Sequence, residues 1–219
     1  MINSIEERLA TVRARIQAAC ARSGRDPEDV RLIAVTKRLP EESVRAGALA
    51  GVTDFGENYV QELEAKRPAA PSATWHFLGR VQANKARRVA AAADVVHTLE
   101  PGRSPSRLAV AAAERGEALP CLIEVDFTGR RVGVAPGEAE TFVESLGSEL
   151  EVRGLMTVAP QGEDPRPSFL ALRELRDRLR VRFPTLVELS MGMTADLDAA
   201  VEEGATMVRV GTAIFGPRP

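Results

Sequence analysis

Short apolar runs alternate with amphipathic stretches along most of the chain. Polar segments with helix-like apolar spacing, such as residues 167–183, separate these runs. Strand–helix alternation of this kind predicts a parallel sheet, and eight units favour closure into a barrel over an open doubly wound sheet. We therefore expect an α/β fold, a single (β/α)₈ TIM barrel over residues 1–219. The apolar runs are residues 31–37, 53–57, 75–79, 94–99, 120–127, 150–158, 186–192 and 207–216.

An amphipathic helix is expected before the first strand, over Ser4 to Arg22. Apolar residues recur at helical spacing from Ile5 to Ile16, and Ser4 stands three positions before Glu7, which is the spacing of a capping box. The eighth run lies close to the end of the sequence, so we expect no helix after it. We infer that the N-terminal helix takes the eighth helical position of the barrel.

The composition of the chain argues against several classes of function. The 219 residues are 44% hydrophobic, and the charged residues, 27% of the total, give a net charge of −2 with both signs interspersed. Neither nucleic acid nor an anionic membrane is an expected partner of such a surface. No run reaches the roughly 18 apolar residues of a membrane span, and the acidic N-terminus lacks the basic region of a secretory signal. We expect a cytoplasmic protein.

Cysteine and histidine give no metal pattern. Cys20 falls in a helical stretch and Cys121 in an apolar run, so both are interpreted as small core residues of a reducing compartment. His76 and His97 are the two histidines, and they lack the clustered spacing of metal ligands. No metal site is expected.

Lys37 is the first candidate for chemistry, because active sites of these barrels lie at the carboxyl ends of the strands. Period-two alternation places Ile33, Val35 and Lys37 on one face, so that Lys37 points into the barrel mouth if Val35 lines the interior. Partial desolvation would lower its ammonium pKa and yield an amine able to attack an aldehyde. The alternative is a lysine that extends from a strand end to solvent.

The loops after strands seven and eight resemble a phosphate site. Such loops commonly bind phosphate in these barrels through backbone N–H groups. Ser190 and Thr212 offer hydroxyl groups, while Gly192 and Gly211 permit close backbone approach. Each small residue alone could be an ordinary loop residue at a strand end, but together these residues suit the binding of one dianion.

Arg209 shares a strand face with Gly211 and needs a buried acceptor. A pyridine nitrogen would serve. Because arginine retains its proton, that nitrogen would stay unprotonated and its ring would be a poorer electron sink. The alternative is a structural ion pair with Glu188 or Glu124.

Six blocks occur in the order LIAVTK, FGENYVQE, WHFLGRVQANK, RGLMTV, LSMGMTAD and VRVGTAIFG. From Ile33 to Gly216 the chain thereby resembles the pyridoxal phosphate homeostasis protein family. The resemblance implies a barrel of the alanine racemase N-terminal type, with pyridoxal 5′-phosphate (PLP) held as a Schiff base on Lys37. It also implies that Arg209 faces the pyridine nitrogen. The residues that it places around the phosphate are Ser190, Gly211 and Thr212.

The resemblance adds Asn58 near the cofactor ring, where the amide could bind the ring oxygen or a bridging water. Capping of a helix that begins at Tyr59 is the alternative role. Asp126 and Arg131 replace residues that are more often asparagine and lysine in the family, which leaves the contacts of that loop open. Thr194 stands where serine is frequent and keeps the hydroxyl. The basic run 82–88 is interpreted as a solvated helix face, with an anion or partner site as the alternative.

The expected role is that of a carrier. A racemase needs acid–base groups on both faces of its substrate, and Tyr59, the only tyrosine, is expected to pack beside Phe55. The resemblance implies a non-catalytic protein that maintains vitamin B6 and the linked amino-acid and keto-acid balance. Its partners are PLP and, by extension, apo forms of PLP enzymes. A monomer is expected, because the second domain that makes the dimer contact in alanine racemase is missing. A PLP-dependent racemase or lyase, and a cofactor-free barrel enzyme with a Lys37 Schiff base, are the alternatives.

Overall fold

Eight parallel strands form one closed barrel, in chain order from β1 to β8, in a computed structural model that describes residues 4–217. The barrel closes where β8 pairs with β1, with Ile33 opposite Arg209. This confirms the expected α/β barrel with a helix ahead of the first strand. The strands are β1 Arg31–Val35, β2 Asp54–Glu57, β3 Thr74–Phe77, β4 Val95–Leu99, β5 Leu119–Glu124, β6 Leu150–Met156, β7 Glu188–Ser190 and β8 Met207–Val210.

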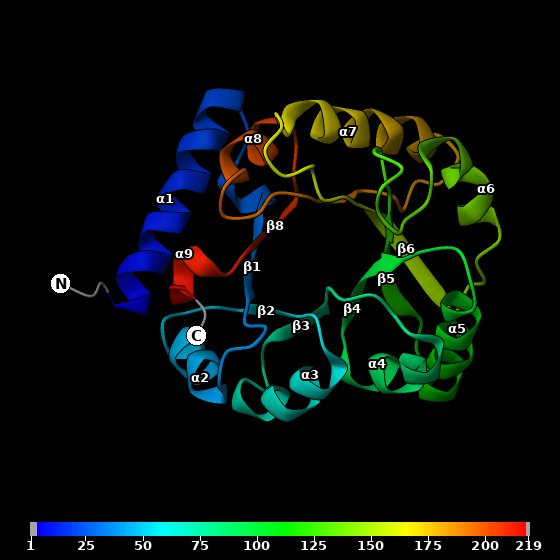
Figure 1. Cartoon of the computed structure of the whole chain (residues 1–219), viewed down its shortest axis with the longest axis horizontal. Coiled ribbons are helices and arrows are strands. Elements are labelled where there is room, and N and C mark those ends of the chain that lie inside the picture. The colour runs from blue at the N-terminus through cyan, green and yellow to red at the C-terminus, as the bar shows by residue number, and fades with distance from the viewer. Residues whose placement is uncertain (1–3, 218–219) are drawn as a thin grey trace.

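Helices surround the strands as an outer ring (Figure 1). They are α1 Ile5–Ser23, α2 Glu41–Leu49, α3 Val60–Lys66, α4 Ala86–Ala92, α5 Ser104–Arg115, α6 Ala139–Glu144, α7 Arg166–Arg180, α8 Leu197–Glu202 and α9 Thr212–Phe215. Short 3₁₀ helices cover Pro27–Asp29, Arg67–Ala69, Ala83–Lys85 and Pro136–Glu138.

The segment after β8 differs from expectation. The run 207–216 was predicted as one strand with no helix after it, yet the strand ends at Val210 and Thr212–Phe215 form the one-turn helix α9. This helix packs against α1, and its Ile214 is fully buried. The run is therefore apolar for two reasons: its first part packs in the barrel as β8, and its last part packs against α1 as α9. Periodicity over so few residues does not distinguish a strand from a helix.

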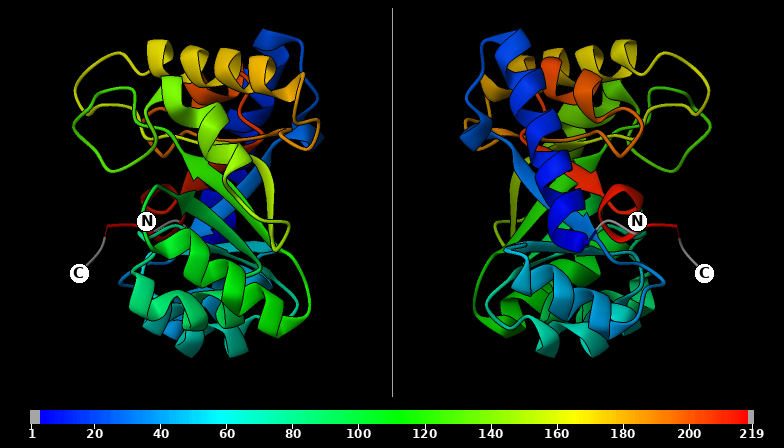
Figure 2. Two further views of the ribbon diagram at one scale, coloured as in Figure 1. Left: turned by 90° about the vertical axis from the view of Figure 1, so that its right-hand side faces the viewer. Right: turned by 90° about the vertical axis from the view of Figure 1, so that its left-hand side faces the viewer.

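Helix α1 lies beside α8 in the outer ring and crosses the barrel wall obliquely (Figures 1 and 2). Its capping box is present: the Ser4 hydroxyl accepts from the Glu7 N–H at 3.2 Å, and Glu7 accepts from the Ser4 N–H at 3.0 Å. The Leu9, Val12 and Ile16 side chains are buried, and each contributes about 1.5–3 kcal/mol of burial energy. This position supports the inference that α1 fills the eighth helical place.

Two apolar clusters form the core. The larger lies between the strands and the helices, where Phe55 stacks on Trp75 with ring centroids 5.3 Å apart. It also contains Cys20 and Cys121, both buried free thiols. The smaller cluster is composed of Ile33, Val95, Leu122, Met156 and Met207. Because side chains alternate along each strand, this second set fills the barrel interior.

The basic run 82–88 lies on an outer surface. Arg87 pairs with Glu114 at 3.0 Å, and Arg88 pairs with Glu64. These contacts favour the solvated-face interpretation. Among residues 4–217, no helix combines the length and the apolar character that crossing a membrane requires. Nor do three His, Cys, Asp or Glu side chains in that range gather closely enough to hold a metal ion.

Candidate functional site

A cavity of about 510 Å³ opens at the carboxyl ends of the strands. Five of the six residues predicted to bind the cofactor line it: Lys37, Asn58, Arg209, Gly211 and Thr212. They come from the ends of β1, β2 and β8, which are far apart in the sequence and adjacent in the barrel. The structure thus brings together groups that the sequence suggested one at a time.

Lys37 lies in the turn after β1, because the strand ends at Val35, two residues earlier than predicted. The side chain is half-buried and lines the cavity. The next residue, Arg38, has φ of 60°, a left-handed conformation that costs a residue other than glycine about 1–2 kcal/mol. The Arg38 N–H donates to Glu62 Oε2 at 2.7 Å. Helix α3 therefore holds the Lys37 turn in a strained conformation.

Four residues form what we call the α3 cluster, namely Thr36, Glu57, Glu62 and Lys66. Lys66 Nζ donates to Glu57 Oε1 at 2.7 Å, to Glu62 Oε2 at 2.6 Å and to the Thr36 carbonyl at 2.8 Å. Burial raises the pKa of Glu57, although hydrogen bonds from Lys66 and Thr36 oppose this shift. Glu57 Oε2 has no hydrogen-bond partner among the described residues. The cluster therefore fixes the Lys37 turn while one buried oxygen remains unsatisfied.

Asn58 follows β2 and faces the same cavity. Its backbone lies so close to Gly79 that a Cβ there would approach the Asn58 carbonyl oxygen to 1.9 Å, which only glycine avoids. The capping alternative for Asn58 is wrong: α3 begins at Val60, and its N-cap position is Tyr59. Asn58 is free of that role and keeps its place in the cavity wall.

Tyr59 does not have the setting expected of it. It is 43% exposed, whereas Phe55 is fully buried and stacks on Trp75. The Tyr59 hydroxyl lies 3.4 Å from Arg38 Nη2. The side chain thus stays near the surface at the start of α3, outside the set that lines the cavity.

Arg209 projects from β8 into the barrel and is 7% exposed. Its Nη1 donates to Ser190 Oγ at 2.6 Å, and its Nη2 donates to the Thr157 carbonyl at 2.9 Å. Burial lowers the Arg209 pKa to about 10, so the guanidinium remains a cation at neutral pH. Further N–H donors of the group are left for an acceptor in the cavity that it lines.

The alternative of a structural ion pair finds no support. Within residues 4–217, no carboxylate oxygen of Glu188 or Glu124 lies within ion-pair distance of Arg209. Glu188 Oε2 accepts instead from the Thr206 hydroxyl at 2.5 Å. Glu124 Oε1 lies 3.9 Å from Arg131 Nη2. The buried cation of Arg209 is therefore held by neutral acceptors.

Ser190 is placed differently from the expected phosphate ligand. It is fully buried, its hydroxyl contacts Arg209 and His97, and it does not line the cavity. On the same loop Thr194 does line the cavity. Gly192 lets the loop approach α8, since its φ is 90° and a Cβ there would lie 2.4 Å from the Ala200 Cβ. The hydroxyl groups that face the cavity here are those of Thr194 and Thr212.

Glu124, at the end of β5, also lines the cavity. Burial raises its pKa to about 7, although the Arg131 charge lowers it. A carboxyl with this pKa can accept and return a proton near neutral pH. From the sequence, Glu124 was expected only as an ion-pair partner of Arg209. Its place at a strand end was the signal that could have identified it.

The loop after β5 is organised by Asp126. One carboxylate oxygen accepts from the Thr128 N–H at 2.8 Å, and the other accepts from the Arg131 N–H at 2.8 Å. Arg131 thereby reaches the cavity wall. The loops after β5 and β6 project from the same end of the barrel (Figure 2), and Arg130 lies 3.8 Å from Glu163 across them. The residues that depart from the family pattern therefore shape the cavity rim.

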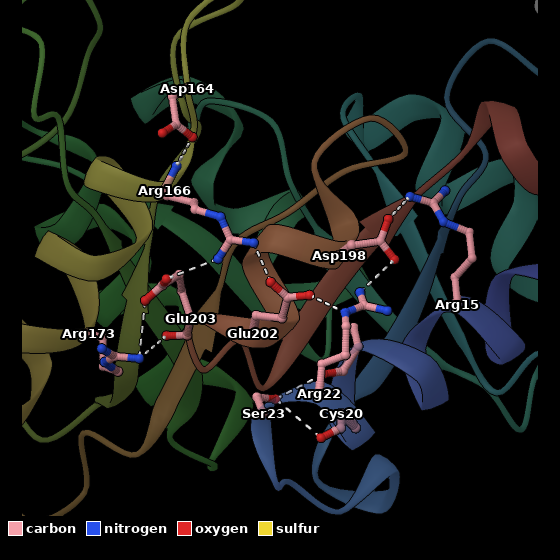
Figure 3. A network of polar contacts seen from close by, with 11 residues as sticks. Arg15, Cys20, Arg22, Ser23, Asp164, Arg166, Arg173, Asp198, Glu202 and Glu203 are labelled. Atoms are coloured by element: carbon pink, nitrogen blue, oxygen red, sulfur yellow. Dashed lines mark hydrogen bonds and ion pairs between the residues drawn. The ribbon is translucent and has the colours of Figure 1, made fainter.

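Helix α1 supports the wall beside β7. Arg15 Nη1 donates to the Thr194 carbonyl at 3.1 Å. Further along α1, Arg22 pairs with Glu202 of α8, which also binds Arg166 of α7 (Figure 3). Exposed pairs of this kind are individually weak. The direct bond from Arg15 nevertheless connects the N-terminal helix to a residue of the cavity.

The chain matches one protein family and several of its members. Residues 8–219 match the family described as alanine racemase, N-terminal domain. The pyridoxal phosphate homeostasis protein of Pseudomonas aeruginosa is 38% identical over 226 residues, covering 99% of this chain and 97% of that protein. PipY of Synechococcus elongatus, solved with PLP bound, superposes with a TM-score of 0.84 at 36% identity, covering 97% of this chain and 100% of that chain.

Alanine racemase of Clostridium difficile, in complex with cycloserine, shows the same fold at greater distance. Its TM-score is 0.78 at 15% identity, and the match covers 100% of this chain and 60% of the racemase. This likeness supports the fold alone. With the full-length matches above, the chain belongs to the pyridoxal phosphate homeostasis proteins, within the alanine racemase N-terminal domain family.

Proposed function

We propose that this protein binds PLP through Lys37 and acts as a carrier that keeps the free cofactor low. The observation that carries the proposal is the single cavity that gathers an amine, a buried guanidinium and two loops rich in hydroxyl and N–H groups. PLP presents an aldehyde, a pyridine nitrogen and a phosphate dianion, and it supplies an electron-withdrawing ring when bound. The cavity volume, about 510 Å³, lies in the range of small-cofactor sites.

Each wall of the cavity suits one part of that molecule. The Lys37 amine would attach to the aldehyde carbon with loss of water. Thr194, Gly211 and Thr212 would hold the phosphate, and Arg209 would donate to the ring nitrogen. Because Arg209 keeps its proton near neutral pH, the ring nitrogen would stay unprotonated and withdraw electrons weakly. This arrangement favours holding the cofactor over amino-acid turnover.

Delivery completes the proposed role. We expect the protein to work in the cytoplasm as a monomer and to pass PLP to apo forms of PLP enzymes, thereby contributing to vitamin B6 balance. Loaded protein is mixed with an apo-aminotransferase, and activation by wild type is compared with activation by Lys37→Ala and Lys85→Ala. Lys85 lies outside the cavity, so its variant should match wild type, whereas Lys37→Ala should deliver little.

The attachment itself has a direct measurement. Loaded wild type should be yellow, and borohydride should bleach it and leave a mass label on Lys37. A label on Lys66 or Lys85, or a colourless protein that cannot be reconstituted, contradicts the proposed site.

Glu124 favours a second candidate, a PLP-dependent racemase or lyase, because its pKa of about 7 provides an acid–base group in the cavity. Loaded protein is incubated with single-enantiomer amino acids. Robust turnover by wild type that Glu124→Gln abolishes would replace the carrier proposal.

A further inference from the structure

A chain of four hydrogen bonds crosses the barrel interior behind Arg209. Arg209 Nη1 lies 2.6 Å from Ser190 Oγ, and Ser190 Oγ lies 2.9 Å from His97 Nδ1. His97 Nε2 lies 2.9 Å from His76 Nδ1. His76 Nε2 lies 3.0 Å from Asp54 Oδ1. We call these five residues the relay; they come from β8, β7, β4, β3 and β2.

The relay can carry its protons in one direction. A guanidinium only donates, so Ser190 Oγ accepts from Arg209, and its own proton is available to His97 Nδ1. His97 then carries its proton on Nε2 and donates it to His76 Nδ1. His76 likewise carries its proton on Nε2 and donates to the Asp54 carboxylate. In this pattern both imidazoles are neutral, and both adopt the Nε2–H tautomer.

Burial and charge agree with this assignment. His76 and His97 are both fully buried. The pKa of His97 lies well below its usual value because of burial, with the Arg209 charge contributing. Burial opposes ionisation of Asp54, yet hydrogen bonds from His76 and Thr53 bring its pKa below the usual value. The relay thus runs from a buried cation to a buried anion through neutral groups.

We propose that Asp54, His76, His97 and Ser190 are positioning residues that fix the guanidinium of Arg209 toward the cavity. Ser190 and the Thr157 carbonyl hold the two Nη atoms, so the plane of the guanidinium is set from behind. Among the relay members, Arg209 alone lines the cavity. Asp54 borders a second cavity, of about 390 Å³, that is lined by residues such as Leu9 and Arg31. The relay therefore spans the interior and presents a fixed donor to a neutral acceptor.

This inference rests on the proposed function only for the identity of that acceptor, the pyridine nitrogen of PLP. The proton pattern can be measured without any ligand. The chain has two histidines, and both belong to the relay, so ¹⁵N-histidine NMR of the protein without added PLP reports on the relay alone. We expect both rings as neutral Nε2–H tautomers at neutral pH. An imidazolium or an Nδ1–H tautomer in either ring overturns the proposal.

Ser190→Ala removes the link between Arg209 and His97. Titration with PLP should show a dissociation constant about tenfold above that of wild type, the effect of losing one bond to a charged group. The absorbance maximum of the bound cofactor should also shift, which a purely structural role would not cause. Thr185→Val removes a hydroxyl bond to the Val152 carbonyl outside the relay and should leave both readouts unchanged.

Asp54→Asn keeps an acceptor for His76 and removes the charge, which covers the case in which Ser190→Ala does not fold. A smaller loss of affinity and a smaller spectral shift are expected. If wild type binds PLP and both relay variants match it in affinity and spectrum, the positioning role is wrong and the carrier function stands. If wild type does not bind PLP, the carrier function fails, and the NMR result still decides the relay.

Discussion

The two walls of the cavity are built on opposite plans. The Lys37 wall depends on the α3 cluster, which leaves Glu57 Oε2 without a partner and holds Arg38 at φ of 60°. In the Arg209 wall the relay bonds the guanidinium from behind and leaves its remaining N–H groups toward the cavity, and α1 adds the bond from Arg15 to the Thr194 carbonyl. The Lys37 wall is strained and leaves a buried oxygen unsatisfied, whereas the Arg209 wall is held by a continuous series of hydrogen bonds.

The difference fits the proposed carrier, which would have to hold a ring firmly and still release it. We expect the hydrogen-bonded frame behind Arg209 to keep its geometry with and without a bound ring. A strained turn at Lys37 lies nearer in energy to other conformations by the cost of its left-handed residue, about 1–2 kcal/mol. We therefore expect motion to concentrate at the Lys37 turn.

Removal of residues 1–24 should have the largest effect. It exposes the contacts of Leu9, Val12 and Ile16 and removes the support of the Arg209 wall. We expect a loss of more than about 5 kcal/mol, comparable with the whole stability of a domain. Thermal unfolding checks this. A melting point equal to that of the full chain would show that α1 is not part of the barrel.

Lys66→Met tests the charge pairing of the other wall. Lys66 is 5% exposed, and its loss leaves Glu57 as a buried carboxylate without a cation. We expect a loss of about 3–5 kcal/mol in the free energy of unfolding, measured by urea titration. The double variant Lys66→Met/Glu57→Gln should recover much of it. A single variant as stable as wild type would contradict the pairing.

The relay predicts a pH dependence. The folded pKa of His97 lies well below 6.5, its ordinary value. Below pH 6.5 the unfolded chain therefore binds a proton that the folded chain does not, and stability falls as pH drops. The slope contributed by His97 approaches about 1.4 kcal/mol per pH unit. Urea titrations between pH 5 and 8 measure it as about a one-proton change, and His97→Gln should show a flatter profile; equal slopes count against a buried neutral His97.

The strain at Arg38 predicts the smallest change. Arg38→Gly removes the left-handed penalty, whereas Arg38→Ala retains it. The glycine variant should be more stable than the alanine variant by about 1 kcal/mol, as measured by thermal unfolding. The reverse order would place the strain elsewhere than in this turn.

Most of the architecture was predictable because local patterns determine it. The apolar runs identified eight strands, and Ser4 with Glu7 identified the start of α1. The strand ends were predicted less accurately: the run 31–37 continues past Val35 because Thr36 is also buried, bonded both to Gly56 and Glu57 of β2 and to Lys66 of α3. Burial of either origin selects similar residues, so a sequence does not distinguish them.

The residues that line the cavity could be predicted from the sequence, but the hydrogen bonds behind them could not. Lys37, Asn58, Arg209, Gly211 and Thr212 were identified, and each lines the cavity. The relay was not foreseen, since the contact of His76 with His97 depends on how β3 lies beside β4 in the closed barrel. The raised pKa of Glu124 likewise depends on surroundings that only the fold provides.

Closure of the barrel between β1 and β8 has a consequence for biogenesis. Arg31 pairs with Met207, so nearly the whole sequence must be synthesised before the two edges meet. Contacts at such separation form late and slowly. A nascent chain therefore exposes open sheet edges and histidines without their final partners until β8 emerges, and such intermediates are prone to aggregation. We therefore expect the cavity to form late in folding, and a ribosome-bound fragment that stops short of β8 would lack Arg209, Gly211 and Thr212 from the cavity wall.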